Sequence, residues 1–107
     1  MNQHLRAFVE SHPEGWGHEE WLGLLADLAH QAFDVSDTEA IGYALENERL
    51  AWELRRKAVP GLGPRRIDAV VDRFGTLWSL QNADVEELAA IKTIPSSLAE
   101  KVVGAVR

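Results

Sequence analysis

The chain has 107 residues, of which 46% are apolar, and its 11 basic and 17 acidic side chains give a formal charge of −6. This size and composition predict one compact folded unit and argue against a disordered chain. The absence of cysteine and of any long uncharged apolar stretch excludes disulfides, thiolate metal sites and membrane spans, so we expect a cytoplasmic protein.

The first half of the chain has the apolar spacing of helices. We expect helices over residues 3–11, 18–33 and 36–58, with a loop at 12–17 where one proline and two glycines interrupt the pattern. The third of these helices begins with a Ser36-x-x-Glu39 sequence, which has the form of a capping box. Three tryptophans fall at apolar helical positions and are expected in the core: Trp21, Trp52 and Trp78. Trp16 lies between loop glycines, where packing against a helix and an exposed docking role are both open.

The stretch VPGLGPRR, residues 59–66, predicts the end of one helix and the start of another. Pro60 cannot continue a helix, and Gly61 and Gly63 permit positive φ. Pro64 suits the first turn of a new helix. Further short helices are expected near residues 76–80 and 84–91, and a last one over 96–106. No segment alternates as a strand would, so the predicted fold class is all-α.

The acidic charge belongs almost entirely to the first half. Residues 1–54 carry two basic and eleven acidic side chains, whereas residues 55–107 carry nine basic and six acidic ones. No carboxylate lies between Leu54 and Ile67, where five cations gather: Arg55, Arg56, Lys57, Arg65 and Arg66. Such a cluster suggests a face for an anionic partner. An ordinary solvated surface, with three of the cations at a helix C-terminus, explains the cluster at least as well.

The second half repeats itself with a period of 32 residues. The turn centred on Gly61-Leu62-Gly63 matches a turn centred on Thr93-Ile94-Pro95, and each is flanked by helices. The matching apolar pairs are Val59 with Ile91, Leu62 with Ile94, Ile67 with Ala99, Val70 with Val102, and Val71 with Val103.

Four segments of residues 57–107 carry a resemblance: V-P-G-L-G-P-R-R-I-D-A-V-V, R-F-G-T-L, E-E-L-A-A-I and I-P-S-S-L-A-E-K-V-V. With these segments in this order, residues 57–107 resemble a tandem helix-hairpin-helix domain. The order is similar to the C-terminal domains of the bacterial excinuclease C subunit and related structure-specific repair nucleases. We therefore expect two parts, an acidic helical segment at residues 1–56 and a tandem helix-hairpin-helix unit at residues 57–107 packed on it. The first part resembles no family that we can name.

The resemblance implies DNA binding through backbone phosphates without sequence specificity, in an accessory role in DNA repair or recombination. Because a phosphate must approach backbone N–H groups, a Cβ at Gly61 or Gly63 would obstruct it or forbid the needed backbone angles. The expected DNA-binding residues are Gly61, Leu62, Gly63, Arg65, Arg66, Ser96, Ser97 and Lys101.

The second hairpin departs from the family pattern at two positions. Thr93 stands where glycine is usual, and Pro95 lacks an N–H that a phosphate would accept. We therefore expect the second hairpin to be a weaker binder or a structural half, and the first to provide most of the grip.

No catalytic or metal-binding pattern is present, so we expect no enzyme activity. The related nucleases carry a separate domain with clustered carboxylates, and residues 12–20 lack the spacing of metal ligands. No cofactor is expected, although in some family members a monovalent cation lies between hairpin carbonyls and a phosphate, which the sequence leaves open here. The alternative function is a protein-interaction or dimerisation module, in which the acidic half docks a basic protein or a second copy of the chain.

Overall fold

The computed structural model describes all of residues 1–107 as seven helices without a strand. The all-α prediction is therefore confirmed. The helices are α1 (Asn2–Ser11), α2 (His18–His30), α3 (Thr38–Lys57), α4 (Pro64–Phe74), α5 (Leu77–Gln81), α6 (Val85–Ala89) and α7 (Ser96–Val106). None of them is both long and apolar enough to cross a bilayer.

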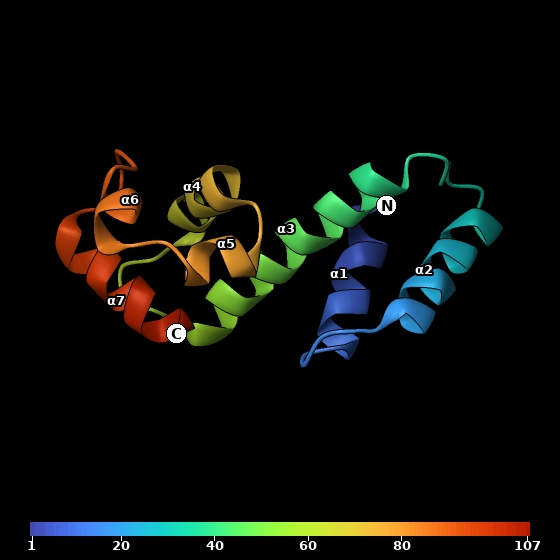
Figure 1. Ribbon diagram of the computed structural model, residues 1–107, viewed down its shortest axis with the longest axis horizontal. Helices are drawn as coiled ribbons and strands as arrows, with labels where there is room; N and C mark the ends of the chain where they lie inside the picture. Colours follow the sequence, from blue (N-terminus) through green and yellow to red (C-terminus); the bar gives the residue numbers. More distant parts are fainter.

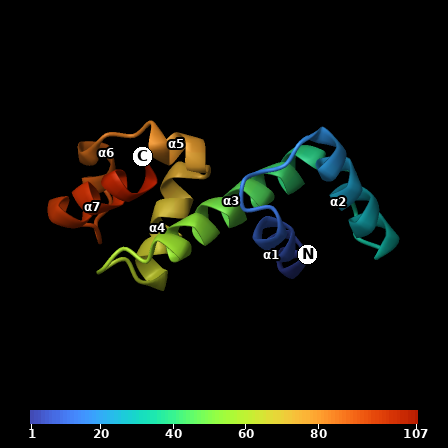
Figure 2. The same ribbon diagram turned by 90° about the horizontal axis from the view of Figure 1, so that it is seen from below.

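The long helix α3 joins two groups of helices (Figure 1). Helices α1 and α2 lie beside its N-terminal half, and α4 to α7 gather around its C-terminal half. The molecule is elongated, with extents of 46 × 23 × 21 Å. Seen from below in Figure 2, the two groups remain at opposite ends of α3, so α1 and α2 are separated from the hairpins along the long axis.

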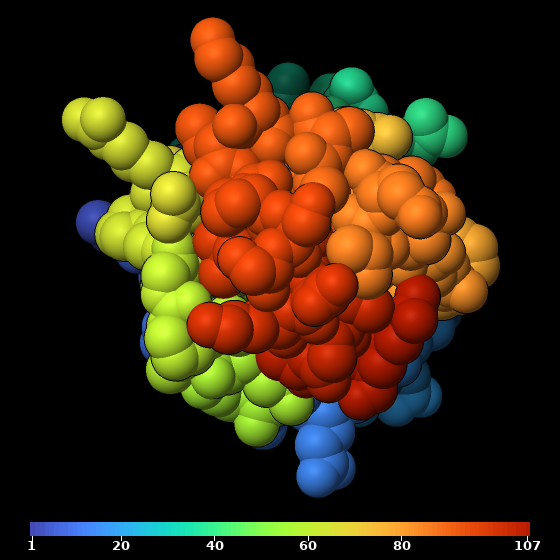
Figure 3. Space-filling view, turned by 90° about the vertical axis from the view of Figure 1, so that its left-hand side faces the viewer, coloured from blue at the N-terminus to red at the C-terminus, as the bar shows by residue number.

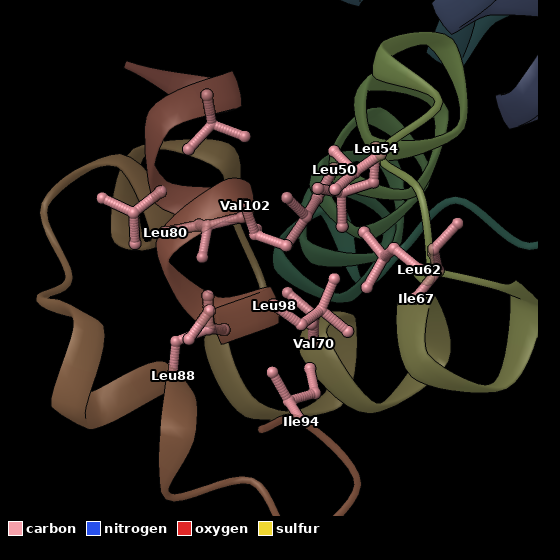
Figure 4. Packing of buried hydrophobic residues seen from close by; sticks show 14 residues of the cluster. Leu50, Leu54, Leu62, Ile67, Val70, Leu80, Leu88, Ile94, Leu98 and Val102 are labelled. Carbon is pink, nitrogen blue, oxygen red and sulfur yellow. The ribbon is translucent and has the colours of Figure 1, made fainter. Parts of the chain in front are cut away.

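Each group has its own apolar core. The smaller core lies between α1, α2 and the start of α3, and consists of Leu5, Val9, Leu24, Leu28, Ile41 and Leu45. The larger core has 14 residues, many of which point into one shared interior between α3, α4 and α7 in Figure 4. Leu50 and Leu54 of α3 belong to this larger core. The last turns of α3 therefore support the hairpin unit, and a boundary between residues 56 and 57 stays a prediction.

Helix α3 begins one residue later than the capping-box pattern predicts. Its N-cap is Asp37, whose carboxylate accepts the Ala40 N–H at 3.1 Å. The Ser36 N–H instead donates to Asp34 Oδ1 at 2.9 Å, and this hydrogen bond lowers the pKa of the Asp34 carboxyl. The helix ends at Lys57, and its C-cap Ala58 adopts a left-handed conformation with φ +50° and turns the chain into the first hairpin.

Of the three tryptophans expected in the core, two are half-buried and one is exposed. Trp21 and Trp52 are half-buried against the smaller core, and Trp16 packs edge-on against Phe8 with the ring centroids 5.2 Å apart. The prediction that Trp78 is a core residue is wrong, because its side chain is 70% exposed. Helix α5 is only five residues long, and it buries Leu80 instead.

Candidate nucleic-acid interface

The two hairpin turns are built alike. The Leu62 N–H donates to the Val59 carbonyl at 3.0 Å, and the Ile94 N–H donates to the Ile91 carbonyl at the same distance. The side chains of Leu62 and Ile94 are both buried in the larger core, where Figure 4 shows them. Each turn is therefore closed by one backbone hydrogen bond and anchored by one apolar side chain.

The two turns differ in backbone conformation. Gly61 has φ +88° directly after Pro60, which is the pattern of a type II turn and favours glycine. Thr93 does not have positive φ, since Ala32 and Ala58 are the only non-glycine residues that do. The second turn thus closes without a left-handed residue, which explains why threonine is accepted there.

Gly63 needs no special backbone angle. Its φ of −80° and ψ of −178° are extended, as is usual before a proline, and a Cβ built on it would meet no atom within 4 Å. Of the two reasons expected for glycine in this turn, the need for a special backbone angle therefore applies to Gly61 alone. The missing side chain at Gly63 instead leaves the N-terminus of α4 open to an approaching group.

The N-terminus of the helix that follows each hairpin turn carries three backbone N–H groups without an acceptor in the protein. At the start of α4 they belong to Gly63, Arg65 and Arg66. At the start of α7 they belong to Ser96, Ser97 and Leu98. These are the unpaired donors that every helix N-terminus carries.

Each of the two helix N-termini lacks one N–H group because of a proline. Pro95 lacks an N–H, as expected, but Pro64 lacks one in the first hairpin at the position that matches Ser96. Because one loss offsets the other, the N-termini of α4 and α7 offer equal numbers of free donors. The weaker grip expected of the second hairpin therefore has no support from its donor count, and its role stays a prediction.

Two exposed cations belong to the helices that carry these donors. Arg65 and Lys101 are exposed and form no ion pair, and Ser96 and Ser97 are exposed beside the start of α7. The first hairpin also lines an open hollow of about 560 Å³, formed by Val59 and residues 61–66. In the end-on view of Figure 3, the yellow-green first hairpin and the orange second hairpin lie on the same end of the molecule.

Two of the expected site residues are engaged within the protein. The Leu62 side chain is in the core and its N–H closes the turn, so Leu62 serves the site by holding the turn in place. The Arg66 guanidinium donates to the carbonyls of Gly61 and Thr93, each at 2.7 Å. No sequence pattern predicts this bridge, because Arg66 and Thr93 are 27 residues apart.

The geometry agrees with the comparison to protein families. The model of the SAM-like helix-hairpin-helix tandem matches residues 53–107, which is about half of the chain and includes both hairpins. The chain belongs to the tandem helix-hairpin-helix family. The match also includes the last turns of α3, in agreement with their place in the larger core.

Curated relatives carry the name UvrABC system protein C. The protein from Sodalis glossinidius is 28% identical over 100 residues, which are 94% of this chain and 16% of that protein. The one from Trichlorobacter lovleyi is 39% identical over 84 residues, 76% of this chain and 13% of that protein. This chain thus spans about one sixth or less of either relative. No solved structure matches it significantly.

Proposed function

We propose that this chain binds DNA through backbone phosphates, without reading sequence, in an accessory role in DNA repair or recombination. The observation that carries the proposal is the pair of exposed helix N-termini, α4 and α7, on hairpins of the tandem helix-hairpin-helix family. The similarity to proteins named UvrABC system protein C supports a role in DNA repair.

The chemistry of the hairpins suits phosphate. A helix N-terminus combines unpaired N–H donors with partial positive charge, and an anion there gains about 0.3–1 kcal/mol at an exposed position. Arg65 adds a full charge, and its guanidinium is able to hold a phosphate with two hydrogen bonds. Backbone donors and flexible cations of this kind position a protein on the duplex but carry no sequence information.

The acidic side chains of α1 and α2 are compatible with this role. Helices α1 and α2 lie at the other end of the long axis from the hairpins (Figure 1). The Debye length is about 8 Å at physiological salt, so charges at the far end of a molecule 46 Å long are largely screened from a duplex at the hairpins.

Binding to unrelated DNA sequences tests the absence of sequence reading. We expect two forked duplexes of the same shape and different sequence to bind with equal affinity in fluorescence anisotropy, with dissociation constants of about 10⁻⁴–10⁻⁶ M. Single-stranded and blunt duplex probes in the same series report the preferred DNA shape. A tenfold difference between the two forked sequences would contradict the proposal.

Four further expectations concern catalysis, location in the cell, a bound cation and a protein partner. We propose binding without catalysis, in the cytoplasm. A hairpin-bound monovalent cation fits these residues poorly, because the positively charged Arg66 guanidinium already lies 2.7 Å from the Gly61 carbonyl and would repel it. A basic protein partner or a second copy docked on the acidic half stays a prediction from its charge.

A further inference from the structure

Arg66 connects the backbones of the two hairpin turns. It lies in the first turn of α4, and its Nη1 donates to the Gly61 carbonyl of its own hairpin at 2.7 Å. Its Nε donates to the Thr93 carbonyl of the other hairpin, also at 2.7 Å. Hydrogen bonds with an ionised donor are stronger than neutral ones. A single side chain therefore holds both turns.

The two carbonyls occupy matching positions of the 32-residue repeat. Gly61 corresponds to Thr93, so Arg66 lies between equivalent points of the two hairpins. The residue that corresponds to Arg66 in the second hairpin is Leu98, which is buried. Leu98 Cδ1 lies 3.6 Å from the position that a Cβ on Gly61 would take. Each hairpin thus sends a side chain to the turn of the other, one polar and one apolar.

Arg65 provides the contrast. It precedes Arg66 in the chain, is exposed, and makes no hydrogen bond or ion pair with the rest of the protein. Arg65 is therefore available to a phosphate, whereas two of the Arg66 donor groups are already used by carbonyls.

We propose that Arg66 is a positioning residue that fixes the separation of the two phosphate-binding turns, and with it the spacing of the phosphates that the domain grips. This rests on the proposed function. Both turns engage one DNA molecule only if their free N–H groups keep a set distance from each other, and turns that move independently lose entropy when both bind. A planar guanidinium reaches two carbonyls in a fixed fork, which the point charge of lysine does not reproduce.

The test compares Arg66→Lys with Arg73→Lys, since both variants keep the net charge and Arg73 is an exposed residue of the last turn of the same helix, outside the proposed site. Loss of a hydrogen bond from a charged donor predicts that Arg66→Lys weakens forked-duplex binding about five- to tenfold. We expect Arg73→Lys to stay within about twofold, because it keeps the charge and lies at the other end of α4 from the hairpin turns. Thermal unfolding midpoints of both variants within a few degrees of the wild type show that the loss is not caused by unfolding.

A second measurement follows the bridge without DNA. Amide hydrogen exchange at Ile94, whose N–H closes the second turn, should be faster in Arg66→Lys and unchanged in Arg73→Lys. Unchanged exchange in Arg66→Lys overturns the bridge. Wild-type affinity in Arg66→Lys overturns the positioning role alone, whereas a folded wild-type protein that binds no DNA overturns the proposed function as well.

Discussion

Replacing Leu62 with alanine is expected to lower the free energy of unfolding by about 2–4 kcal/mol. Leu62 is 8% exposed, and its side chain fills the larger core between α3, α4 and α7. The substitution removes buried methyl groups and leaves a cavity that the closed turn above it cannot collapse into, since the Leu62 N–H is bonded to the Val59 carbonyl. Urea denaturation followed by circular dichroism measures the change.

An exposed leucine provides the control for the loss of the buried Leu62 side chain. Leu22 is 49% exposed on α2, so Leu22→Ala is a matched control that should cost less than about 1 kcal/mol. The DNA affinity of Leu62→Ala should also fall once it is corrected for the unfolded fraction. The reason is that a turn without its anchor holds the N–H groups of α4 less firmly in place. A Leu62→Ala protein that is as stable as the wild type would contradict the role of Leu62 as the anchor of the turn.

Replacing Gly63 with aspartate is expected to change stability and DNA affinity in opposite directions. Gly63 is the N-cap of α4 with extended angles and open space around it, so an aspartate fits without strain. Its carboxylate would accept the free N–H of Arg65 or Arg66 and lie at the positive end of the helix, which raises the unfolding free energy by about 0.5–1 kcal/mol. The same carboxylate occupies the phosphate donors and repels the phosphate, so the affinity should fall about tenfold or more.

The variant Gly63→Asn separates the effect of occupying the N–H donors from the effect of the negative charge. Asparagine caps a helix N-terminus as well as aspartate but carries no charge. Its affinity should lie between those of the wild type and Gly63→Asp, because it occupies the donors without repelling the phosphate. If Gly63→Asp binds DNA as the wild type does, the N-terminus of α4 is not the phosphate site.

The parts of the fold that depend on local chemistry could be predicted from the sequence. Pro60, Gly61 and Pro64 dictate a helix end, a left-handed residue and a helix start, and all three are found. The pairing of Leu62 with Ile94 at a spacing of 32 residues predicted two matching turns flanked by helices, and both turns are found. That both apolar side chains are buried in the core was not predicted. The resemblance carried by these residues identified the family, which the match over residues 53–107 confirms.

The features that depend on contacts between distant residues could not be predicted. The bridge from Arg66 to Thr93 requires the two hairpins to be docked, and no local pattern encodes that contact. Trp78 has the spacing of a core residue, but α5 is too short to bury more than one side. From the sequence, Thr93 looked like a replacement of a required glycine. The structure shows that the second turn needs no positive φ at this position.

The central claim, that the hairpins bind backbone phosphates, is tested most directly by the salt dependence of wild-type binding to a forked duplex. With two to four phosphate contacts, a plot of log K against log salt concentration should be linear with a slope of about −2 to −4. Arg65→Ala removes one charge from this face and should reduce the steepness by about 0.9. A folded protein that shows no binding at about 50 mM salt, or binding that does not change with salt, would contradict the claim.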